Sequence, residues 1–343
     1  MRTTTQIVLS QRPTGRVDEG CFTAEQIPLP EPGDGEVLVG SCWLAFAPAQ
    51  RSALNDIPSY VPPVALGEVM RGTGVGQVLA SRHSGFSEGD LVVGPIGWQE
   101  HCVMNPDTVS SPLELVPTDI GDPKLVLTVL GVSGMTAYFG MKKFGRPTTG
   151  DTVLVTAAAG SVGSLAGQIA RAFGAERIIG TAGSEEKLEW AREIAGFDAC
   201  VDYHDSHVFR ALRAAANGGG FDVIFDNVGG SLLDNALGNI SNGARVVLCG
   251  SISTGYMPKR AEVGLHNYAY LTTRRGTMAG FIVTDFADEF PAAIAEMRSW
   301  IAAGKLSWAE DMVEGLENAP ATLQRLFDGK NLGKQLLHIA DPA

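Results

Sequence analysis

The residues best suited to do chemistry form a glycine turn between an apolar strand and a helix. In Asp151-Thr-Val-Leu-Val-Thr-Ala-Ala-Ala-Gly-Ser-Val-Gly163, the glycines at 160 and 163 let the backbone approach a pyrophosphate. The helix that follows offers unpaired N–H groups and positive partial charge to the same phosphates. Alanine stands at the usual first glycine, so the pattern is Ala158-x-Gly160-x-x-Gly163. We predict a dinucleotide-binding corner here, the alternative being an Ala/Gly-rich joint that serves only packing.

The residues about twenty positions further on bear on which dinucleotide is bound. NAD-binding folds carry an acidic residue there, which bonds the ribose hydroxyls. Here the strand ends in Gly183 and Ser184, with no carboxylate at its tip. Glu185 and Glu186 would complement the dipole of the next helix, with Ser184 as its N-cap. Lys187 can reach a 2′-phosphate, unless it is a solvated helix lysine, so Ser184 and Lys187 favour NADP(H) as the cofactor.

The elements that position these residues alternate between strands and helices from about residue 124. Such alternation predicts an α/β fold with a doubly wound parallel sheet. The expected strands are 152–157, 176–181, 199–203, 222–226, 244–249 and 277–283. The expected helices are 162–174, 184–195, 206–216, 231–240 and 285–303.

The first 120 or so residues read differently, as short apolar runs separated by Gly, Pro and Asp. The runs at 36–39, 74–79 and 90–93 predict a mostly antiparallel β domain. Residues 305–343 look like a return to it, with a closing strand at 334–339. We therefore expect a catalytic β domain of residues 1–123 completed by 305–343, and an NADP-binding domain of residues 124–304.

Composition limits the partners. The 343 residues carry a net charge of −12, which argues against nucleic acid and anionic membrane surfaces. The five cysteines form no C-x-x-C pair, as expected of reduced thiols in a cytosolic protein. The N-terminal apolar run is too short for a signal-peptide core, and no stretch approaches a membrane span. A cytoplasmic protein without membrane or nucleic-acid partners is the expectation.

Short motifs in a shared order along nearly the whole chain carry a family resemblance. They are 58–63, 97–101, 130–138, 157–164, 182–187, 226–230, 249–253, 280–283, 315–320 and 329–334. With them the chain resembles the zinc-independent medium-chain dehydrogenase/reductases, in the group of prostaglandin, alkenal double-bond and curcumin reductases. The resemblance implies a Rossmann doubly wound parallel sheet with a GroES-like catalytic β domain.

The resemblance also assigns the cofactor contacts. The pyrophosphate side is implied at Ala159, Gly160, Ser161 and Val162, with Gly163 completing the turn. Lys187 and Tyr203 would hold the 2′-phosphate, and Asn227 would lie near the dinucleotide. The nicotinamide half is implied at Cys249, Ser251, Ile252, Ser253, Phe281, Ile282, Val283 and Asn331. A homodimer is implied through the cofactor domain, in which residues 277–283 would extend the sheet unless they form an ordinary buried strand.

No metal site is expected. Zinc-dependent relatives need a Cys/His/Glu set and a four-cysteine lobe, and where they carry Gly-His-Glu this chain has Gly67-Glu68-Val69. His204 and His207 are three apart but sit beside aspartates on what reads as a surface turn. Without a Lewis acid to activate a hydroxyl, reduction of a polarised C=C bond is favoured over alcohol oxidation.

The expected reaction is NADPH-dependent reduction of an α,β-unsaturated carbonyl, an enone or enal. Its enolate needs a hydrogen-bond donor, for which Tyr256 is the first candidate and Tyr60 the second, each being otherwise a packed loop tyrosine. The substrate side departs from the family: the loop before Tyr256 is one residue longer, 47–52 reads Ala-Pro-Ala-Gln-Arg-Ser, and Ser133 replaces a proline. A quinone oxidoreductase and a non-catalytic cofactor-binding protein stay as alternatives, and substrate identity is not carried over.

Overall fold

The computed structural model describes residues 2–57, 59, 61–108, 112–256 and 264–343. The chain divides into two compact units. Unit 1 runs to Leu127 and is completed by Tyr256 and by Glu310–Ala343, whereas unit 2 holds Thr128–Gly255 and continues to Ala309. The division at 123/124 and 304/305 into a catalytic β domain and an NADP-binding domain stays a prediction.

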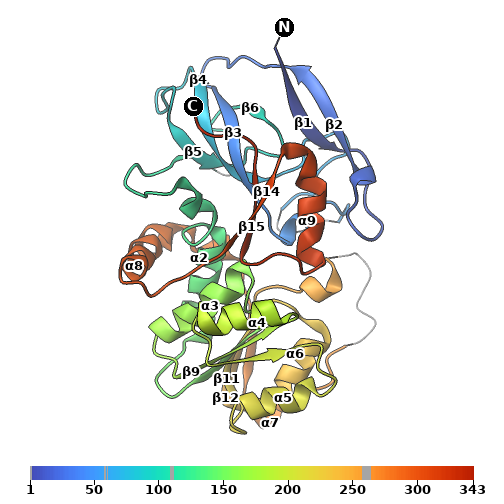
Figure 1. Cartoon of the computed structure of the whole chain (residues 1–343), viewed down its shortest axis with the longest axis vertical. Coiled ribbons are helices and arrows are strands. Elements are labelled where there is room, and N and C mark those ends of the chain that lie inside the picture. Colours follow the sequence, from blue (N-terminus) through green and yellow to red (C-terminus); the bar gives the residue numbers. More distant parts are fainter. Residues whose placement is uncertain (1, 58, 60, 109–111, 257–263) are drawn as a thin grey trace. The chain divides into compact units, whose positions relative to one another are not determined.

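Unit 2 is built on a six-stranded parallel sheet in the order β10-β9-β8-β11-β12-β13 (Figure 1). Numbered from β8, this is the order 3-2-1-4-5-6 of a Rossmann fold, so the predicted doubly wound α/β architecture is confirmed. The chain reverses its direction of travel across the sheet between β8 and β11. The strands are β8 (Thr152–Val155), β9 (Arg177–Ala182), β10 (Ala199–Asp202), β11 (Phe221–Asp226), β12 (Ile240–Leu248) and β13 (Thr277–Gly280).

Helices bury both faces of this sheet because alternate strand residues point to opposite sides. Leu154, Ile179 and Ile224 belong to one apolar cluster with the helices α5 and α6. The π-helical turn Gly140–Gly145 packs on the other side, where Val223 and Phe225 come close to its glycines. The helices are α2 (Val132–Phe139), α3 (Ser161–Ala172), α4 (Glu185–Glu193), α5 (Val208–Ala215), α6 (Gly230–Leu237), α7 (Ala269–Thr273) and α8 (Phe290–Ala302).

Several predicted element bounds in unit 2 are wrong, and three of them have a clear physical reason. The helix expected to reach residue 240 ends at Leu237, because Ile240 already pairs with Phe221 as the first residue of β12. The strand expected to reach residue 283 ends at Gly280, which pairs with Leu248, the last residue of β12. The helix expected from residue 285 is a 3₁₀ segment up to Glu289, and α8 starts where Pro291 fits the first turn.

Unit 1 contains a mostly antiparallel sheet in the order β14-β15-β3-β4-β5-β7, with β6 paired to β3 and only the pair β14–β15 parallel (Figure 1). A separate hairpin joins β1 and β2. The strands are β1 (Thr3–Leu9), β2 (Phe22–Pro28), β3 (Val37–Ala45), β4 (Thr73–Ser81), β5 (Leu91–Gly94), β6 (His101–Met104), β7 (Glu114–Leu115), β14 (Glu310–Glu314) and β15 (Lys334–His338). The helices are α1 (Ala49–Ser52) and α9 (Ala319–Phe327).

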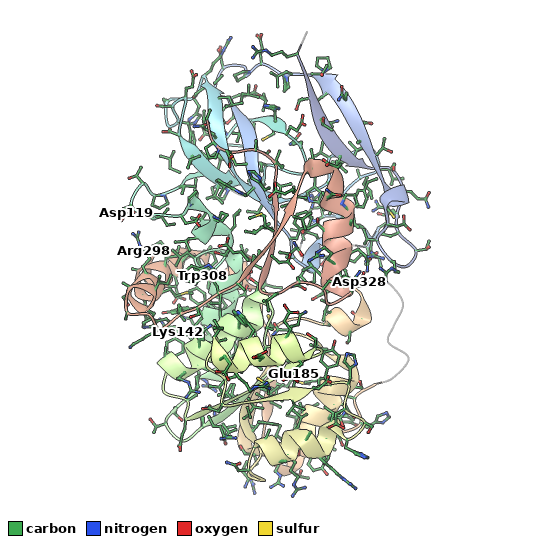
Figure 2. All side chains as sticks on the ribbon, in the orientation of Figure 1. Asp119, Lys142, Glu185, Arg298, Trp308 and Asp328 are labelled. Atoms are coloured by element: carbon green, nitrogen blue, oxygen red, sulfur yellow. The ribbon has the colours of Figure 1, made fainter. Side chains whose placement is uncertain are left out.

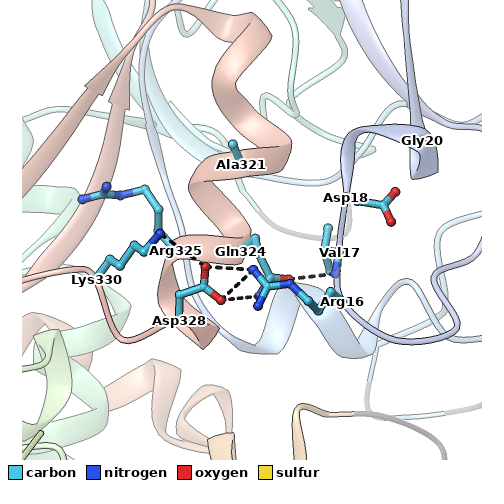
Figure 3. A pocket seen from close by; sticks show the side chains of 9 residues that line it. All are labelled: Arg16, Val17, Asp18, Gly20, Ala321, Gln324, Arg325, Asp328 and Lys330. Atoms are coloured by element: carbon cyan, nitrogen blue, oxygen red, sulfur yellow. Dashed lines mark hydrogen bonds and ion pairs between the residues drawn. The ribbon is translucent and has the colours of Figure 1, made fainter.

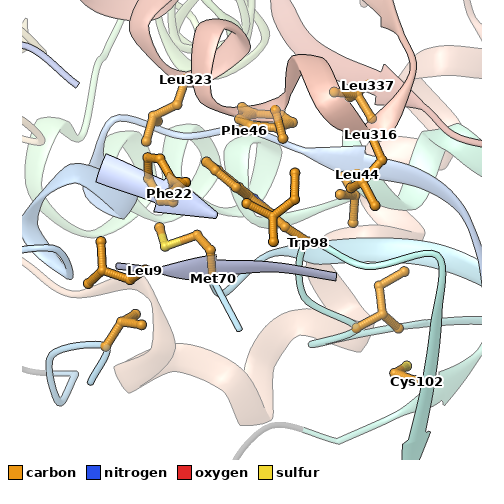
Figure 4. Packing of buried hydrophobic residues seen from close by; sticks show 14 of the residues in the cluster. Leu9, Phe22, Leu44, Phe46, Met70, Trp98, Cys102, Leu316, Leu323 and Leu337 are labelled. Atoms are coloured by element: carbon orange, nitrogen blue, oxygen red, sulfur yellow. The ribbon is translucent and has the colours of Figure 1, made fainter. Parts of the chain in front are cut away.

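The core of unit 1 gathers side chains from both ends of the chain. Trp98 is fully buried, and the rings of Phe22 and Phe46 lie 5.1 and 5.4 Å from it (Figure 4). Leu323 of α9 and Leu337 of β15 belong to the same cluster. The C-terminal segment therefore contributes to this core. Among the described residues, no helix combines the length and the apolar character needed to cross a bilayer.

Candidate cofactor and active site

The glycine turn after β8 has the geometry that a close approach to phosphate requires. Ala157 is in the left-handed region, at φ 54°, which turns the chain sharply out of the strand. A Cβ atom on Gly163 would lie 2.2 Å from the Ala157 carbonyl oxygen, closer than atoms can approach. Only glycine is therefore accommodated at position 163.

The N-terminus of α3 points its unpaired N–H groups out of this turn. The helix begins at Ser161 after the extended N-cap Gly160, so its first N–H groups have no partner inside the helix. Ala159 is buried below the turn, while Ser161 and Val162 are half-buried. An α-helical N-terminus above a glycine cradle fits the pyrophosphate of a dinucleotide. The five residues predicted for this turn, 159–163, therefore lie together.

A buried polar cluster joins β8 to β11 at the point where the strand order reverses. The hydroxyl of Thr156 donates to Oδ1 of Asp226 at 2.8 Å and accepts the N–H of Asn227 at 2.8 Å. The side-chain amide of Asn227 donates to the Thr156 carbonyl at 2.7 Å. Ligands of open α/β sheets bind at such a reversal, outside the carboxyl ends of the strands. The predicted residue Asn227 is thus fixed at this edge of the sheet, where the strand order reverses.

Asp226 is a residue of this cluster that the sequence did not single out as part of the site. It is fully buried, and the backbone N–H groups of Val228 and Gly229 donate to its carboxylate at 3.3 and 2.8 Å. Burial raises the pKa of Asp226, and the hydrogen bond from Thr156 is the leading influence that lowers it. A carboxylate directly after a buried apolar strand was the available signal, but its partner Thr156 is 70 residues away.

The segment after β12 lies against the turn after β11. The N–H of Cys249 donates to the Asp226 carbonyl at 2.8 Å, and that of Ile252 to the Asn227 carbonyl at 3.3 Å. The Ser253 hydroxyl donates to the Val228 carbonyl at 2.6 Å. Burial raises the pKa of the Cys249 thiol to about 12, so it is a neutral lining group. Asn227 and the predicted residues Cys249, Ser251, Ile252 and Ser253 are thereby brought to one edge of the sheet.

Phe281–Val283 follows β13 at the same edge. Because Gly280 pairs with Leu248, Phe281 emerges beside the end of β12. Its ring stacks on Phe144 of the π-helical turn, with centroids 5.2 Å apart and planes 23° apart. Ile282 is extended and Val283 opens the 3₁₀ segment, so these two residues are not part of the strand that the sequence predicted.

The residues predicted for the 2′-phosphate surround the end of β9. The ring of Tyr203 lies over Gly183, where an added Cβ would come within 2.5 Å of the Tyr203 hydroxyl. Ser184 is the exposed N-cap of α4, and Lys187 is half-buried in the first turn of that helix. Glu185, labelled in Figure 2, pairs with Arg192 at 2.7 Å. The same first turn of α4 also carries Glu186, so the 2′-phosphate role of Lys187 and Tyr203 stays a prediction.

The remaining predicted residues belong to unit 1. Asn331 follows α9, and its amide donates to the Gly333 carbonyl at 3.0 Å. Tyr256 packs its ring edge-on against Phe327 at 6.4 Å, and its carbonyl accepts the side-chain amide of Asn55 at 2.7 Å. Tyr60 lies outside the described residues. The catalytic roles of both tyrosines stay predictions, as do all the cofactor contacts.

A hollow on unit 1 between α9 and residues 16–20 contains none of the predicted site residues (Figure 3). Arg16 pairs there with Asp328 at 2.9 Å, and Gln324 accepts the N–H of Val17 at 2.8 Å and donates to Asp328 at 3.0 Å. The side chains of Arg16, Gln324 and Asp328 are thus engaged in contacts within the hollow. Within the described ranges, no group of three or more His, Cys, Asp or Glu side chains is arranged to hold a metal ion. The turn that carries His204 and His207 is exposed, as predicted.

Comparison with known proteins agrees with this geometry. Residues 5–111 match the family model described as the N-terminal domain of oxidoreductase, and residues 161–299 match the one described as zinc-binding dehydrogenase. The chain is 35% identical to the NADPH-dependent curcumin reductase of Escherichia coli (strain K12), covering 97% of this chain and 96% of that protein. It is 36% identical to the NADP(+)-dependent 2-alkenal reductase of Nicotiana tabacum, covering 98% and 97%.

A solved structure is similar over the whole chain. It is the crystal structure of CurA in complex with NADPH from Vibrio vulnificus, with a TM-score of 0.91 and 37% identity. The match covers 98% of this chain and 100% of that one.

Proposed function

The chain belongs to the medium-chain dehydrogenase/reductases, in the group that contains the curcumin, alkenal and prostaglandin reductases, and we propose that it is an NADPH-dependent reductase of C=C bonds. The substrate is an α,β-unsaturated carbonyl compound. The observation that carries the proposal is the glycine cradle at Gly163 below the N-terminus of α3, at the reversal point of the sheet. The NADPH-binding relatives support the same cofactor.

The residues of unit 2 would hold NADPH in three places. The N–H groups at the start of α3, from Ser161 to Gly163, bind the pyrophosphate. Lys187 and Tyr203, with Ser184 beside them, bind the 2′-phosphate. Residues 249–253 and 281–283, at the carboxyl ends of β12 and β13, line the nicotinamide half. When bound, NADPH supplies a hydride to the β-carbon of the substrate.

The protein must then stabilise negative charge on the carbonyl oxygen. A neutral donor positioned for that oxygen lowers the barrier because negative charge builds up there as the β-carbon accepts the hydride and is carried by the resulting enolate. Tyr256 is our first candidate for the donor and Tyr60 the second, since a phenol is neutral at pH 7 and donates one hydrogen bond. A proton delivered to the α-carbon completes the saturated carbonyl product.

Turnover of matched substrates tests this proposal. The purified protein is offered NADPH with an enone, an enal, a quinone and a saturated ketone of similar size. We expect oxidation of NADPH with the enone or enal and formation of the saturated carbonyl compound. Turnover of the quinone alone would favour a quinone oxidoreductase, and no turnover with NADPH bound would favour a cofactor-binding protein without this activity.

We further propose that the protein is a cytoplasmic homodimer joined through β13. This strand is at the edge of the six-stranded sheet, and Met278 on it is 37% exposed. Within the described ranges β13 pairs with β12 alone, and this edge with its exposed Met278 supports addition of the same strand from a second copy across a two-fold axis. Light scattering at micromolar concentration should give twice the chain mass, and Met278→Lys should shift it toward the monomer. A monomeric mass for the unaltered protein would contradict the proposal.

A further inference from the structure

We propose that Asn55, held by the buried Arg51, is a positioning residue that sets the backbone of Tyr256. The inference rests on the proposed function, because it gives Tyr256 the donor role. It concerns Arg51 and Asn55, to which the proposed site assigns no role, and Arg51 belongs to the segment 47–52 whose other residues largely depart from the family. All the residues involved belong to unit 1.

Arg51 is buried to an unusual degree for its type, with 1% of its surface exposed. It lies on α1 and donates to Oδ1 of Asn55 at 2.6 Å. Its other guanidinium nitrogen donates to the carbonyl oxygens of Pro13 and Gly15, both at 3.3 Å. These partners are neutral oxygens, so the guanidinium is used as a rigid multiple donor and not as one half of an ion pair with them.

The guanidinium fixes which way the Asn55 amide faces. Arginine has five donors and no acceptor, so only the amide oxygen of Asn55 can face it. The NH₂ group must then point the other way, and it donates to the Tyr256 carbonyl at 2.7 Å. Asn55 itself is 8% exposed, which leaves little solvent to compete for its amide. Arg51 therefore determines that the NH₂ group of Asn55, and not its oxygen, faces the Tyr256 carbonyl.

Tyr256 needs such support because its backbone is strained. Its φ of 51° is in the left-handed region, which is unfavourable for a residue that carries a side chain. The preceding Gly255 is also left-handed, at φ 62°, so two successive residues reverse the chain here. The hydrogen bond from Asn55 fixes the carbonyl, and the edge-on contact with Phe327 fixes the ring. Together they set where the Tyr256 side chain lies.

Asn55→Asp distinguishes a role of Asn55 in positioning Tyr256 from a role in the stability of the fold. The carboxylate keeps an oxygen for Arg51 and gains a charge-assisted contact with it, so we expect the variant to fold and to melt near the temperature of the unaltered protein. Its second oxygen faces the Tyr256 carbonyl oxygen and repels it, where the amide attracted it. Displacing a catalytic donor in this way should lower kcat for an enone about ten- to a hundredfold. The dissociation constant for NADPH, measured by fluorescence titration, should change by less than about twofold.

Asn105→Asp is the matched control. It makes the same chemical change in unit 1, at an asparagine whose Oδ1 accepts the N–H of Asp107 at 3.0 Å and can still do so as a carboxylate oxygen. We expect its kcat to equal that of the unaltered protein. If Asn55→Asp does not fold, Asn55→Ala removes the amide and is measured in the same assays.

A double-mutant cycle with Tyr256→Phe decides the inference. If Asn55 acts through the tyrosine hydroxyl, Asn55→Asp should lower kcat no further in the Tyr256→Phe background. An equal loss in both backgrounds, an unchanged kcat in folded Asn55→Asp, or a Tyr256→Phe variant with full kcat would each overturn it. Absence of enone turnover by the unaltered protein would instead contradict the proposed function, so the two failures are distinguishable.

Discussion

The strand-reversal edge of unit 2, between β8 and β11, and the Tyr256 region of unit 1 use the same kind of hydrogen bond in different settings. In each, an asparagine Nδ2 donates to a backbone carbonyl at 2.7 Å, from Asn227 to Thr156 in one and from Asn55 to Tyr256 in the other. Asn227 follows a strand that is paired in register with β8, so the sheet itself brings donor and acceptor together. Asn55 and Tyr256 lie in loops separated by 201 residues, and no ladder holds them in register.

The difference shows where this fold is constrained and where it can vary. At the strand-reversal edge, any change must be compatible with strand pairing, with the buried carboxyl group of Asp226 and with a glycine that admits no Cβ. Around Tyr256 the contact depends on two polar side chains, those of Arg51 and Asn55, and neither residue belongs to a strand. The sequence agrees with the motifs of the family at the cofactor side of unit 2 and departs from them in the segments 47–52 and 252–257 around Tyr256. We therefore expect variants of the first to affect cofactor binding and variants of the second to affect turnover.

The largest expected effect is that of Tyr256→Phe, which tests whether the Tyr256 region of unit 1 affects turnover and leaves cofactor binding unchanged. If the hydroxyl stabilises the enolate oxygen, kcat for an enone should fall about ten- to a thousandfold while NADPH affinity stays nearly constant. Tyr268→Phe, at a tyrosine that is 61% exposed, is the control and should have no effect. A fall in NADPH affinity with kcat retained would make Tyr256 a cofactor-positioning residue and leave Tyr60 as the donor candidate.

Gly163→Ala tests the cofactor side. The new methyl would collide with the Ala157 carbonyl oxygen, 2.2 Å from the position of its Cβ, so the turn must shift away from the phosphates. Overpacking of 1–3 kcal/mol predicts a loss of NADPH affinity of roughly five- to 150-fold. Gly219→Ala is the control, because its Cβ meets nothing closer than 3.7 Å. Equal NADPH affinity in the Gly163→Ala variant would mean that the pyrophosphate is bound elsewhere.

Lys187→Ala tests, within unit 2, the expected contribution of this lysine to the preference for NADPH over NADH. The unaltered protein should bind NADPH much more tightly than NADH, and loss of a charge-assisted contact should reduce that preference by about ten- to a hundredfold. Lys305→Ala, which removes an exposed lysine of the same unit, should leave the preference intact. Isothermal titration with both cofactors measures it. Equal affinities in the unaltered protein would break the assignment of NADP(H).

Chelation should have no effect. A Glu-Val pair stands at residues 68–69, where zinc-dependent relatives have His-Glu, and the four-cysteine lobe is missing from the sequence. Enone turnover should therefore survive prolonged dialysis against a strong chelator, and elemental analysis should find no stoichiometric zinc. One zinc ion per chain, with loss of activity on its removal, would contradict this expectation.

The sequence was most informative where local geometry determines structure. The run from Thr152 to Gly163 predicted a strand, a tight turn and a helix, and these are β8, the left-handed turn at Ala157 and α3. The first and last residues of an element were harder to predict where they depend on pairing with a neighbouring strand. Ile240 reads as the end of a helix, yet it begins β12 because Phe221 lies beside it.

Long-range polar partners could not be predicted. Nothing in the sequence pairs Thr156 with Asp226 or Arg51 with Asn55 and Tyr256, because such hydrogen bonds depend on how the loops fold back and not on any period along the chain. The cofactor candidates of unit 2 lie together because parallel strands end at one edge of the sheet. The residues around Tyr256 follow no such rule, so the sequence named the tyrosine and missed its support.

Deuterium labelling is the most direct test of the proposed C=C reduction, because it shows which carbon of the substrate receives the hydride. The protein is incubated with an enone and NADPH deuterated at the transferred position, and the product is analysed by NMR and mass spectrometry. The proposal predicts a saturated ketone with one deuterium on the former β-carbon and a solvent-derived hydrogen on the α-carbon. An allylic alcohol with deuterium on the carbinol carbon would show carbonyl reduction, and it would contradict the account.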